Sequence, residues 1–209
     1  MATHIAVLQA DAVGFSYPQG AVFANVSLHA NAGVCLVRGG DGRGKSTLLR
    51  VLAGDLPTGS GSLRLKGIDQ KAQPDAYKAQ VFWMDFKTTV FDSITAKAFM
   101  HTTATQHSAF DAQCLPALIE GLSLQEHLDK PLYMLSTGSK RKVWLAAAFA
   151  SGAALTLLDD PFAALDKPSI RFVTAQLAAA AGQLSRVFVV AHYENLESVP
   201  LACQLDLGD

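Results

Sequence analysis

The chain has 209 residues, of which 50% are apolar and 17% are charged. This is enough to bury a hydrophobic core without disulfide or metal cross-links, so a mini-protein and a disordered chain are both excluded. Seventeen basic and 18 acidic residues give a net charge of -1, which excludes the strongly basic surface typical of proteins that bind nucleic acid.

The amino-terminal part of the chain predicts two strands followed by a strand, a loop and a helix. Residues 4–13 alternate loosely between apolar and polar side chains, and residues 22–28 predict a second strand. Residues 34–37 form a short apolar run that ends in glycines. Residues 47–52 then change to helical spacing, which stops at Gly54.

The middle of the chain changes from polar and turn-rich to helical. Residues 55–80 are rich in Gly, Pro and Lys and contain one alternating segment at 62–66. A short apolar strand is predicted at 81–84. Residues 92–135 contain Ala, Thr, Gln and His with few clustered β-branched residues, so they predict a mainly helical insertion.

The last third alternates between helices and strands. Helices are predicted at 139–150 and 168–181, and buried strands at 155–158 and 187–190. Strands and helices that alternate at this length predict an α/β fold, in which a mostly parallel sheet is covered by helices on both faces.

The three cysteines, Cys35, Cys114 and Cys203, are far apart and form no CxxC pair. This spacing predicts neither a disulfide framework nor a zinc site, and it favours a reducing cytosol. The amino terminus has no basic segment before an apolar stretch, so it predicts no signal peptide. The uncharged and mainly apolar run that starts at Val143 and stops before Asp159 is shorter than the ~20 residues that span a bilayer.

A phosphate-binding motif lies between the strand at 34–37 and the helix at 47–52. It matches GxxxxGK[ST] and consists of Gly39, Gly40, Asp41, Gly42, Arg43, Gly44, Lys45 and Ser46. The glycines let successive backbone N–H groups face one point, the following helix adds its positive dipole end, and Lys45 supplies a charge for the outer phosphates. We expect Ser46 to ligate Mg²⁺ and Thr47 to lie beside it. The alternative is a glycine-rich turn with an exposed lysine.

Asp41 is an unusual residue for such a loop, because a carboxylate repels a bound triphosphate. The sequence leaves two arrangements open. Either Arg43 offsets the charge of Asp41, or both side chains point outward.

A second acidic site follows the predicted strand at 155–158. Asp159 and Asp160 come at the carboxyl end of this strand, where open α/β sheets bind ligands. The segment resembles a Walker B strand. We expect Asp159 to help hold Mg²⁺ and Asp160 to face the attacking water.

Four further segments give the chain a family resemblance. The sequence Leu-Ser-Thr-Gly-Ser at 135–139 resembles the signature LSGGQ, and Ala-Ala-Leu-Asp at 163–166 resembles the D-loop. Tyr17 is similar to the aromatic residue that stacks on adenine, with Phe15 as a possible substitute. His192 is similar to the switch histidine, although a lone histidine after a strand is often incidental. Together these motifs resemble the nucleotide-binding subunit of ATP-binding cassette (ABC) transporters, most closely the short cassettes of haem-exporter type.

The resemblance implies a P-loop ABC-type core with small N-terminal antiparallel strands. It implies a single nucleotide-binding domain over 1–209, with a helical subdomain inserted at approximately 86–140. The expected cofactors are ATP and Mg²⁺, with Lys45, Asp160 and His192 as catalytic residues. The expected partners are a second, identical cassette and a membrane permease, with no nucleic acid, on the cytoplasmic face of the inner membrane.

In the family's dimer, the signature of one subunit faces the nucleotide of the other. Ser136 is a good N-cap for the helix that follows, so this helix start and Gly138 are expected to face a partner's γ-phosphate. Lys140, Arg141 and Lys142 add positive charge there, or else form a solvated helix face.

Four positions depart from the family pattern. In the signature, Thr137 replaces a glycine and Ser139 replaces the glutamine. Asp85 replaces the Q-loop glutamine and is expected to help hold Mg²⁺, and Asp160 replaces the catalytic glutamate. Aspartate has nearly the same intrinsic pKa as glutamate but is one methylene shorter, so we expect slowed hydrolysis. Two other functions remain open: a nucleotide-gated binding module with negligible turnover, and an ABC ATPase that acts outside transport, on DNA or ribosomes.

Overall fold

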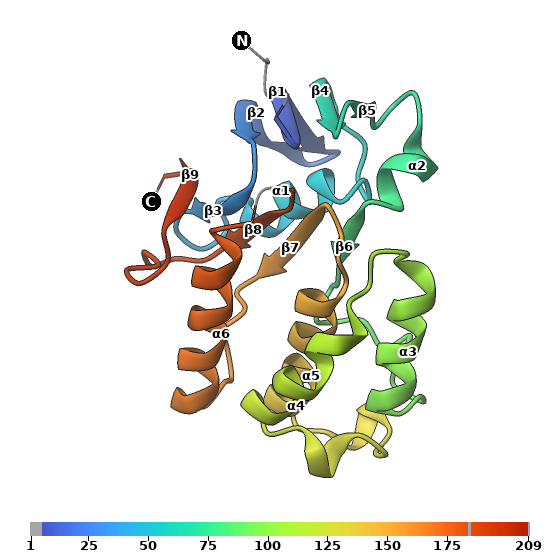
Figure 1. Cartoon of the computed structure of the whole chain (residues 1–209). Helices are drawn as coiled ribbons and strands as arrows, with labels where there is room; N and C mark the ends of the chain where they lie inside the picture. Colours follow the sequence, from blue (N-terminus) through green and yellow to red (C-terminus); the bar gives the residue numbers. More distant parts are fainter. Residues whose placement is uncertain (1–5, 184, 209) are drawn as a thin grey trace.

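The computed structural model describes residues 6–183 and 185–208 of the chain. Figure 1 shows two sheets and a group of helices. A four-stranded antiparallel sheet has the order β2-β1-β4-β5, and a five-stranded parallel sheet has the order β6-β7-β8-β3-β9. The strands are β1 (Leu8–Tyr17), β2 (Gly20–Ala30), β3 (Gly33–Arg38), β4 (Ser60–Leu65), β5 (Ile68–Asp69), β6 (Val81–Trp83), β7 (Leu155–Asp159), β8 (Val187–Ala191) and β9 (Leu201–Asp206).

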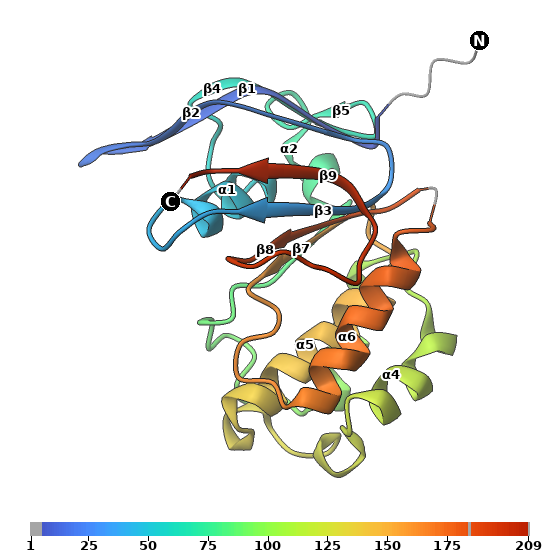
Figure 2. The ribbon, with the colours of Figure 1, turned by 90° about the vertical axis from the view of Figure 1, so that its left-hand side faces the viewer.

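The helices connect these strands and cover the parallel sheet. They are α1 (Lys45–Leu52), α2 (Pro74–Lys78), α3 (Ala96–Gln106), α4 (Leu115–Gly121), α5 (Thr137–Ala150) and α6 (Lys167–Ala180), with 3₁₀ turns η1 (Ala112–Cys114), η2 (Gln125–His127) and η3 (Leu132–Met134). Figure 2 shows α1 between the two sheets, with α5 and α6 on the opposite face of the parallel sheet.

The alternation of side chains along the parallel strands creates two cores. In β3, Val34 and Leu36 pack with the core formed by α3 to α6, whereas Cys35 and Val37 pack with α1 and the antiparallel sheet. Both faces of the sheet are therefore buried, which is why its strands are continuous apolar runs. The predicted α/β class, with a parallel sheet and small N-terminal antiparallel strands, is confirmed.

The predicted helical character of residues 92–135 is also confirmed. Here α3, α4 and the three 3₁₀ turns pack on α5, and the buried contacts include Phe99, Leu118, Leu122 and Trp144. Among the described residues, no helix is both long and apolar enough to cross a bilayer.

Three elements were not predicted: β5, α2 and β9. In β9, half-buried and exposed residues alternate because the strand lies at the edge of the sheet beside β3. Its six residues are interrupted by Gln204 and end at Asp206, so the strand lacks the continuous apolar run that identified the central strands. Residues 4 and 5 of the predicted first strand lie outside the described residues, and β1 extends beyond the predicted end at residue 13, to Tyr17.

The pairing of β9 with β3 corrects the prediction made for the cysteines. Cys35 and Cys203 occupy opposed positions in this parallel pair, with their Cα atoms 4.6 Å apart, and they form a disulfide. The expectation of no disulfide was wrong, because two cysteines that are 168 residues apart in the sequence can still be close in space when their strands pair. Cys114 is free.

The disulfide predicts a thiol count and a stability difference. Denatured, unreduced protein is expected to show the Cys114 thiol alone, and all three cysteines after reduction. Because the cross-link restricts the unfolded chain, reduction should lower the free energy of unfolding by about 2–4 kcal/mol, as measured by urea titration. The Cys203→Ser variant is the control, since reductant should leave its stability unchanged. Three reactive thiols before reduction would show that the disulfide does not form.

Candidate functional site

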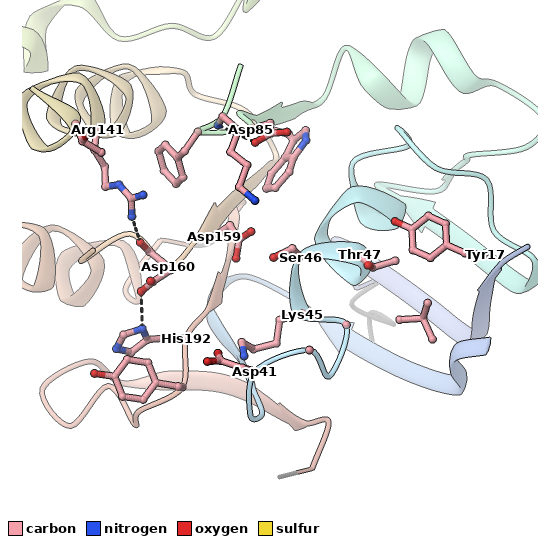
Figure 3. A pocket seen from close by; sticks show the side chains of 18 residues that line it. Tyr17, Asp41, Lys45, Ser46, Thr47, Asp85, Arg141, Asp159, Asp160 and His192 are labelled. Atoms are coloured by element: carbon pink, nitrogen blue, oxygen red, sulfur yellow. Dashed lines mark hydrogen bonds and ion pairs between the residues drawn. The ribbon is translucent and has the colours of Figure 1, made fainter. Parts of the chain in front are cut away.

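A cavity of about 740 Å³ lies at the edge of the parallel sheet where β3, β6, β7 and β8 end (Figure 3). The structure brings eleven of the sixteen predicted site residues to its walls: Tyr17, Asp41, Gly42, Gly44, Lys45, Ser46, Thr47, Asp85, Asp159, Asp160 and His192. It does not place Gly39, Gly40, Arg43, Ser136 or Gly138 there.

The loop from Gly39 to Gly44 curls over the start of α1. Gly44 is the N-cap of this helix with φ 90°, and a Cβ atom there would lie 2.6 Å from a side-chain carbon of Val22. Backbone conformation and space therefore both require glycine. The Lys45 ammonium donates hydrogen bonds to the carbonyls of Gly39 and Gly40 at 2.7 and 2.8 Å, so these two glycines hold Lys45 in place.

Asp41 and Arg43 are both exposed, but only Asp41 lines the cavity. The ion pairs of the described residues do not include one between them. This arrangement favours the second of the two alternatives for Arg43, which is exposed and does not line the cavity, whereas Asp41 lies at the cavity wall.

Asp159 ends β7 beside the start of α1. Burial raises the pKa of the Asp159 carboxyl, and the adjacent Asp160 carboxylate raises it further. A hydrogen bond with the Ser46 hydroxyl, together with the positive charges of Lys45 and Arg141, opposes this shift. The carboxylate of Asp159 and the hydroxyl of Ser46 thus meet at one point of the cavity.

Asp160 follows with a left-handed backbone, φ 46°. This conformation is strained for most residues and is best tolerated by Gly, Asn and Asp. One carboxylate oxygen of Asp160 lies 3.0 Å from Nδ1 of His192, as the dashed line in Figure 3 shows. His192 is 7% exposed and packs between the rings of Phe162 and Tyr193. The structure therefore brings Asp160 and His192, which were each predicted as catalytic residues, into contact within one chain.

Tyr17 and Asp85 lie at the other walls of the cavity. Tyr17 is 37% exposed, whereas Phe15 is 7% exposed and packs edge-on against the Tyr17 ring. Between the two aromatic residues that the sequence left open, Tyr17 is thus the one available to a ligand.

Asp85 accepts a hydrogen bond from the backbone N–H of Lys87 at 2.9 Å, which orients its carboxylate in the loop after β6.

The signature-like segment caps α5. The Ser136 hydroxyl accepts a hydrogen bond from the backbone N–H of Ser139 at 3.1 Å, as predicted, although the helix begins earlier, at Thr137. A Cβ atom at Gly138 would lie 2.4 Å from the carbonyl oxygen of Ala164. Gly138 is thus required by the close approach of the loop that precedes α6.

The three basic residues after the signature do not form a solvated face, so that alternative is wrong. Lys140 pairs with Asp92, and the Lys142 ammonium lies 2.6 Å from the Asp166 carboxylate. Asp166 also accepts from the Ser169 backbone N–H as the N-cap of α6. The hydrogen bond with Lys142 and those at this cap hold the pKa of Asp166 far below its usual range.

Arg141, the third of these residues, lines the cavity and donates to the backbone carbonyl oxygen of Asp160. Sequence reasoning left it open as a source of positive charge beside the signature or as part of a solvated helix face, and did not predict that it lines the cavity of its own chain. Six more lining residues were not predicted as site residues: Val22, Trp83, Phe86, Lys87, Thr137 and Tyr193. Phe86 and Lys87 follow Asp85 directly, and their proximity to that residue was the signal available.

Comparisons with known proteins agree with this geometry. Residues 23–163 match the family model described as ABC transporter. The chain is 31% identical over 189 residues to the cytochrome c biogenesis ATP-binding export protein CcmA of Pseudomonas putida, a match that covers 90% of both chains.

Solved structures share the fold. A putative ABC transporter ATP-binding protein from Pyrococcus furiosus superposes with a TM-score of 0.79 at 21% identity and covers 96% of both chains. An ATP-binding cassette described as a dimer bound to ADP and phosphate superposes with a TM-score of 0.73 at 18% identity, covering 91% of this chain and 89% of its own.

Proposed function

Since the chain belongs to the ABC transporter family, we propose that it is an ATP-hydrolysing subunit that dimerises around MgATP and drives a separate membrane permease. The observation that carries this proposal is the convergence of Lys45, Ser46, Asp159, Asp160 and His192 on one cavity. These residues come from three separate strand ends, and phosphoryl transfer depends on such positioning and charge stabilisation.

The residues present fit a bound MgATP. Mg²⁺ prefers oxygen ligands, keeps several waters and is bound through one or two carboxylates together with substrate phosphates. We propose Ser46 and Asp159 as its protein ligands, with Asp85, which lines the same cavity, as the third residue that helps hold it. Lys45 and the N–H groups at the start of α1 receive the phosphates, and the Tyr17 ring receives the base. Mg²⁺ supplies charge neutralisation at the phosphate oxygens.

Asp160 is the proposed general base. Its carboxylate accepts the proton of the attacking water, and His192 orients that carboxylate through the 3.0 Å contact. Lys45 stabilises the charge on the transferred phosphate. Because aspartate is one methylene shorter than glutamate, this chain places its base farther from the phosphate than a glutamate at the same position would.

The dimer supplies the remaining parts of the site. Ser136 and Gly138 are absent from the cavity of their own chain, and the start of α5 with its N–H groups is an anion-binding feature. We propose that a second copy of the chain presents this helix start to the γ-phosphate in a head-to-tail arrangement. The four departures, with Asp160 held by His192, favour as a second candidate a nucleotide-gated binding module with little turnover.

A groove between the loop after β6 and the start of α5 is the proposed permease contact. Its cavity of about 280 Å³ is lined by Phe86, Tyr133 and Trp144 among others. Val90, Tyr133 and Met134 expose 77%, 68% and 60% of their surface, and exposed apolar residues that gather in one region are typical of protein contacts. We propose that this region of the helical subdomain (86–140) receives a cytoplasmic segment of the permease, so that the chain lies on the cytoplasmic face of the membrane.

The relative in Pseudomonas putida is described as an export protein. We propose the same direction of transport for the permease that this chain drives.

Loss of Lys45 is expected to abolish high-affinity ATP binding. The Lys45→Ala variant removes the cation beside the β- and γ-phosphates, and calorimetric titration with MgATP measures the affinity. The matched control is Lys97→Ala, which removes an exposed lysine on α3. Unchanged affinity in Lys45→Ala would refute the phosphate site and with it the proposed function.

Substitutions of Asp160 separate binding from hydrolysis. Asp160→Asn keeps the side-chain shape and the tolerance for a left-handed backbone, but it removes the base, so turnover should fall about 100-fold or more. ATP binding should persist, and an ATP-bound dimer should accumulate on size exclusion. Asp160→Glu should raise turnover because it restores the missing methylene. Hydrolysis by Asp160→Asn at the parent rate would show that Asp160 is not the base.

Site-specific cross-linking tests the permease contact. A photoreactive phenylalanine analogue at Tyr133 should cross-link to an integral membrane protein in native membranes, identified by mass spectrometry. The same analogue at Asn31, an exposed turn residue between β2 and β3, is the control. Cross-links to membrane proteins from position 31 but not from position 133 would move the contact elsewhere.

A further inference from the structure

Arg141 lies in the wall that separates the nucleotide cavity from the groove proposed for the permease. Three residues line both spaces: Phe86, Thr137 and Arg141. Of these, Arg141 alone carries a charge, and it reaches from the first turns of α5 toward the loop that follows β7 (Figure 3). A movement of Arg141 caused by a partner in the groove would therefore also move atoms that line the nucleotide cavity.

On the side of the nucleotide, Arg141 holds the backbone of Asp160. Its guanidinium donates a hydrogen bond to the Asp160 carbonyl oxygen, which also accepts from the backbone N–H of Ala163 at 3.2 Å. Because Asp160 has φ 46°, a conformation that costs about 1–3 kcal/mol, the surrounding contacts have to maintain it. The direction of the Asp160 carboxylate depends on this backbone.

On the side of the groove, Arg141 packs on an aromatic ring. Its guanidinium carbon lies 4.2 Å from the centre of the Phe86 ring. Phe86 directly follows Asp85 in the loop after β6, and its ring also stacks on Trp144 at 5.1 Å. A planar guanidinium can stack on a ring and donate a directed hydrogen bond at the same time, which a lysine cannot reproduce.

The Arg141 side chain makes no second hydrogen bond among the described residues. Its Nε atom is buried without a hydrogen-bond partner, and its ion pairs to Asp159 or Asp160 are absent from those found among the described residues. A partly buried guanidinium is costly to keep, and its partial burial lowers its pKa. The contacts of Arg141 with the Phe86 ring and with the Asp160 carbonyl offset this cost.

We propose that Arg141 is a positioning residue that holds the backbone conformation of Asp160. Because Arg141 also packs on Phe86, this conformation depends on the position of the loop that lines the permease groove. This rests on the proposed function, because it assigns the role through Asp160. A shift of the Phe86 ring moves the guanidinium and with it the Asp160 carbonyl. A displacement of ~1 Å at a reacting group changes the rate on the order of 100-fold, so a small movement is sufficient.

The kinetic test compares Arg141→Ala with Arg141→Lys and the parent. We expect Arg141→Ala to lower kcat for MgATP about 10- to 100-fold while KM and the nucleotide Kd stay nearly constant. Arg141→Lys restores the hydrogen bond without the stacking, so its kcat should lie between the two. The matched control is Arg171→Ala, which removes an exposed arginine on α6. An unchanged kcat, or a change in KM alone, would overturn the proposal.

Double variants distinguish positioning from a general structural effect. If Arg141 acts through Asp160, then Arg141→Ala should slow single-turnover hydrolysis no further in an Asp160→Asn background. If it acts with Phe86, then Phe86→Leu should lower kcat in the same direction, and the two losses should not add. Full additivity in both pairs would assign Arg141 a structural role only.

Hydrogen exchange provides a readout that does not depend on hydrolysis. In nucleotide-free protein, Arg141→Ala and Phe86→Leu should both speed the exchange of amides in the segment 160–166, and Arg171→Ala should not. If the parent shows no ATPase activity but this exchange difference appears, the proposed function fails while the positioning contact stands. If the exchange of this segment is the same in all variants, the positioning contact is refuted whatever the ATPase activity.

Discussion

The parallel register of β3, β7 and β8 is the constraint on which the site depends. In this register Val37 pairs with Ala191, and Asp159 pairs with the same residue from the other side. The three strands therefore end at one level, and the residues that follow them reach one cavity: the phosphate loop, Asp160 and His192. The register is fixed because one residue of slippage would exchange the side chains of the two cores. Packing of the sheet thus determines the geometry of the chemistry.

Several carboxylates lie at this edge of the sheet, close to a lysine that is held by backbone carbonyls. Asp159 and Asp160 are adjacent, and burial raises the pKa of Asp159. Lys45 is held by the Gly39 and Gly40 carbonyls rather than by either carboxylate, so its charge remains available to an anion. The acidic walls, the Lys45 ammonium and the helix start of α1 together suit a ligand that brings both a metal cation and phosphate groups.

The sequence predicted most of the site because the motifs are local. A strand, a glycine loop and a helix in succession require only neighbouring residues, and so do the apolar run and aspartates of β7. It did not predict β9, the Cys35–Cys203 disulfide or the contacts of Arg141, because each depends on which distant segments become neighbours. Arg141 was indistinguishable from a solvated basic residue until Phe86 and Asp160, 55 and 19 positions away in the sequence, were placed against it.

The edge strand β9 shows why such distant contacts matter to the local motif. Gly40 donates its backbone N–H to the Gly208 carbonyl at 3.0 Å, and Leu207 donates to the Arg38 carbonyl at 2.9 Å. The start of the phosphate loop is therefore paired with the residues after β9, which the disulfide ties to β3. A loop that must present its N–H groups to phosphate without rearranging benefits from an anchored entrance. The phosphate loop is therefore held by the residues after β9, and the Asp160 loop is held by Arg141 of α5. Both parts of the site are held in place by segments that are distant in the sequence.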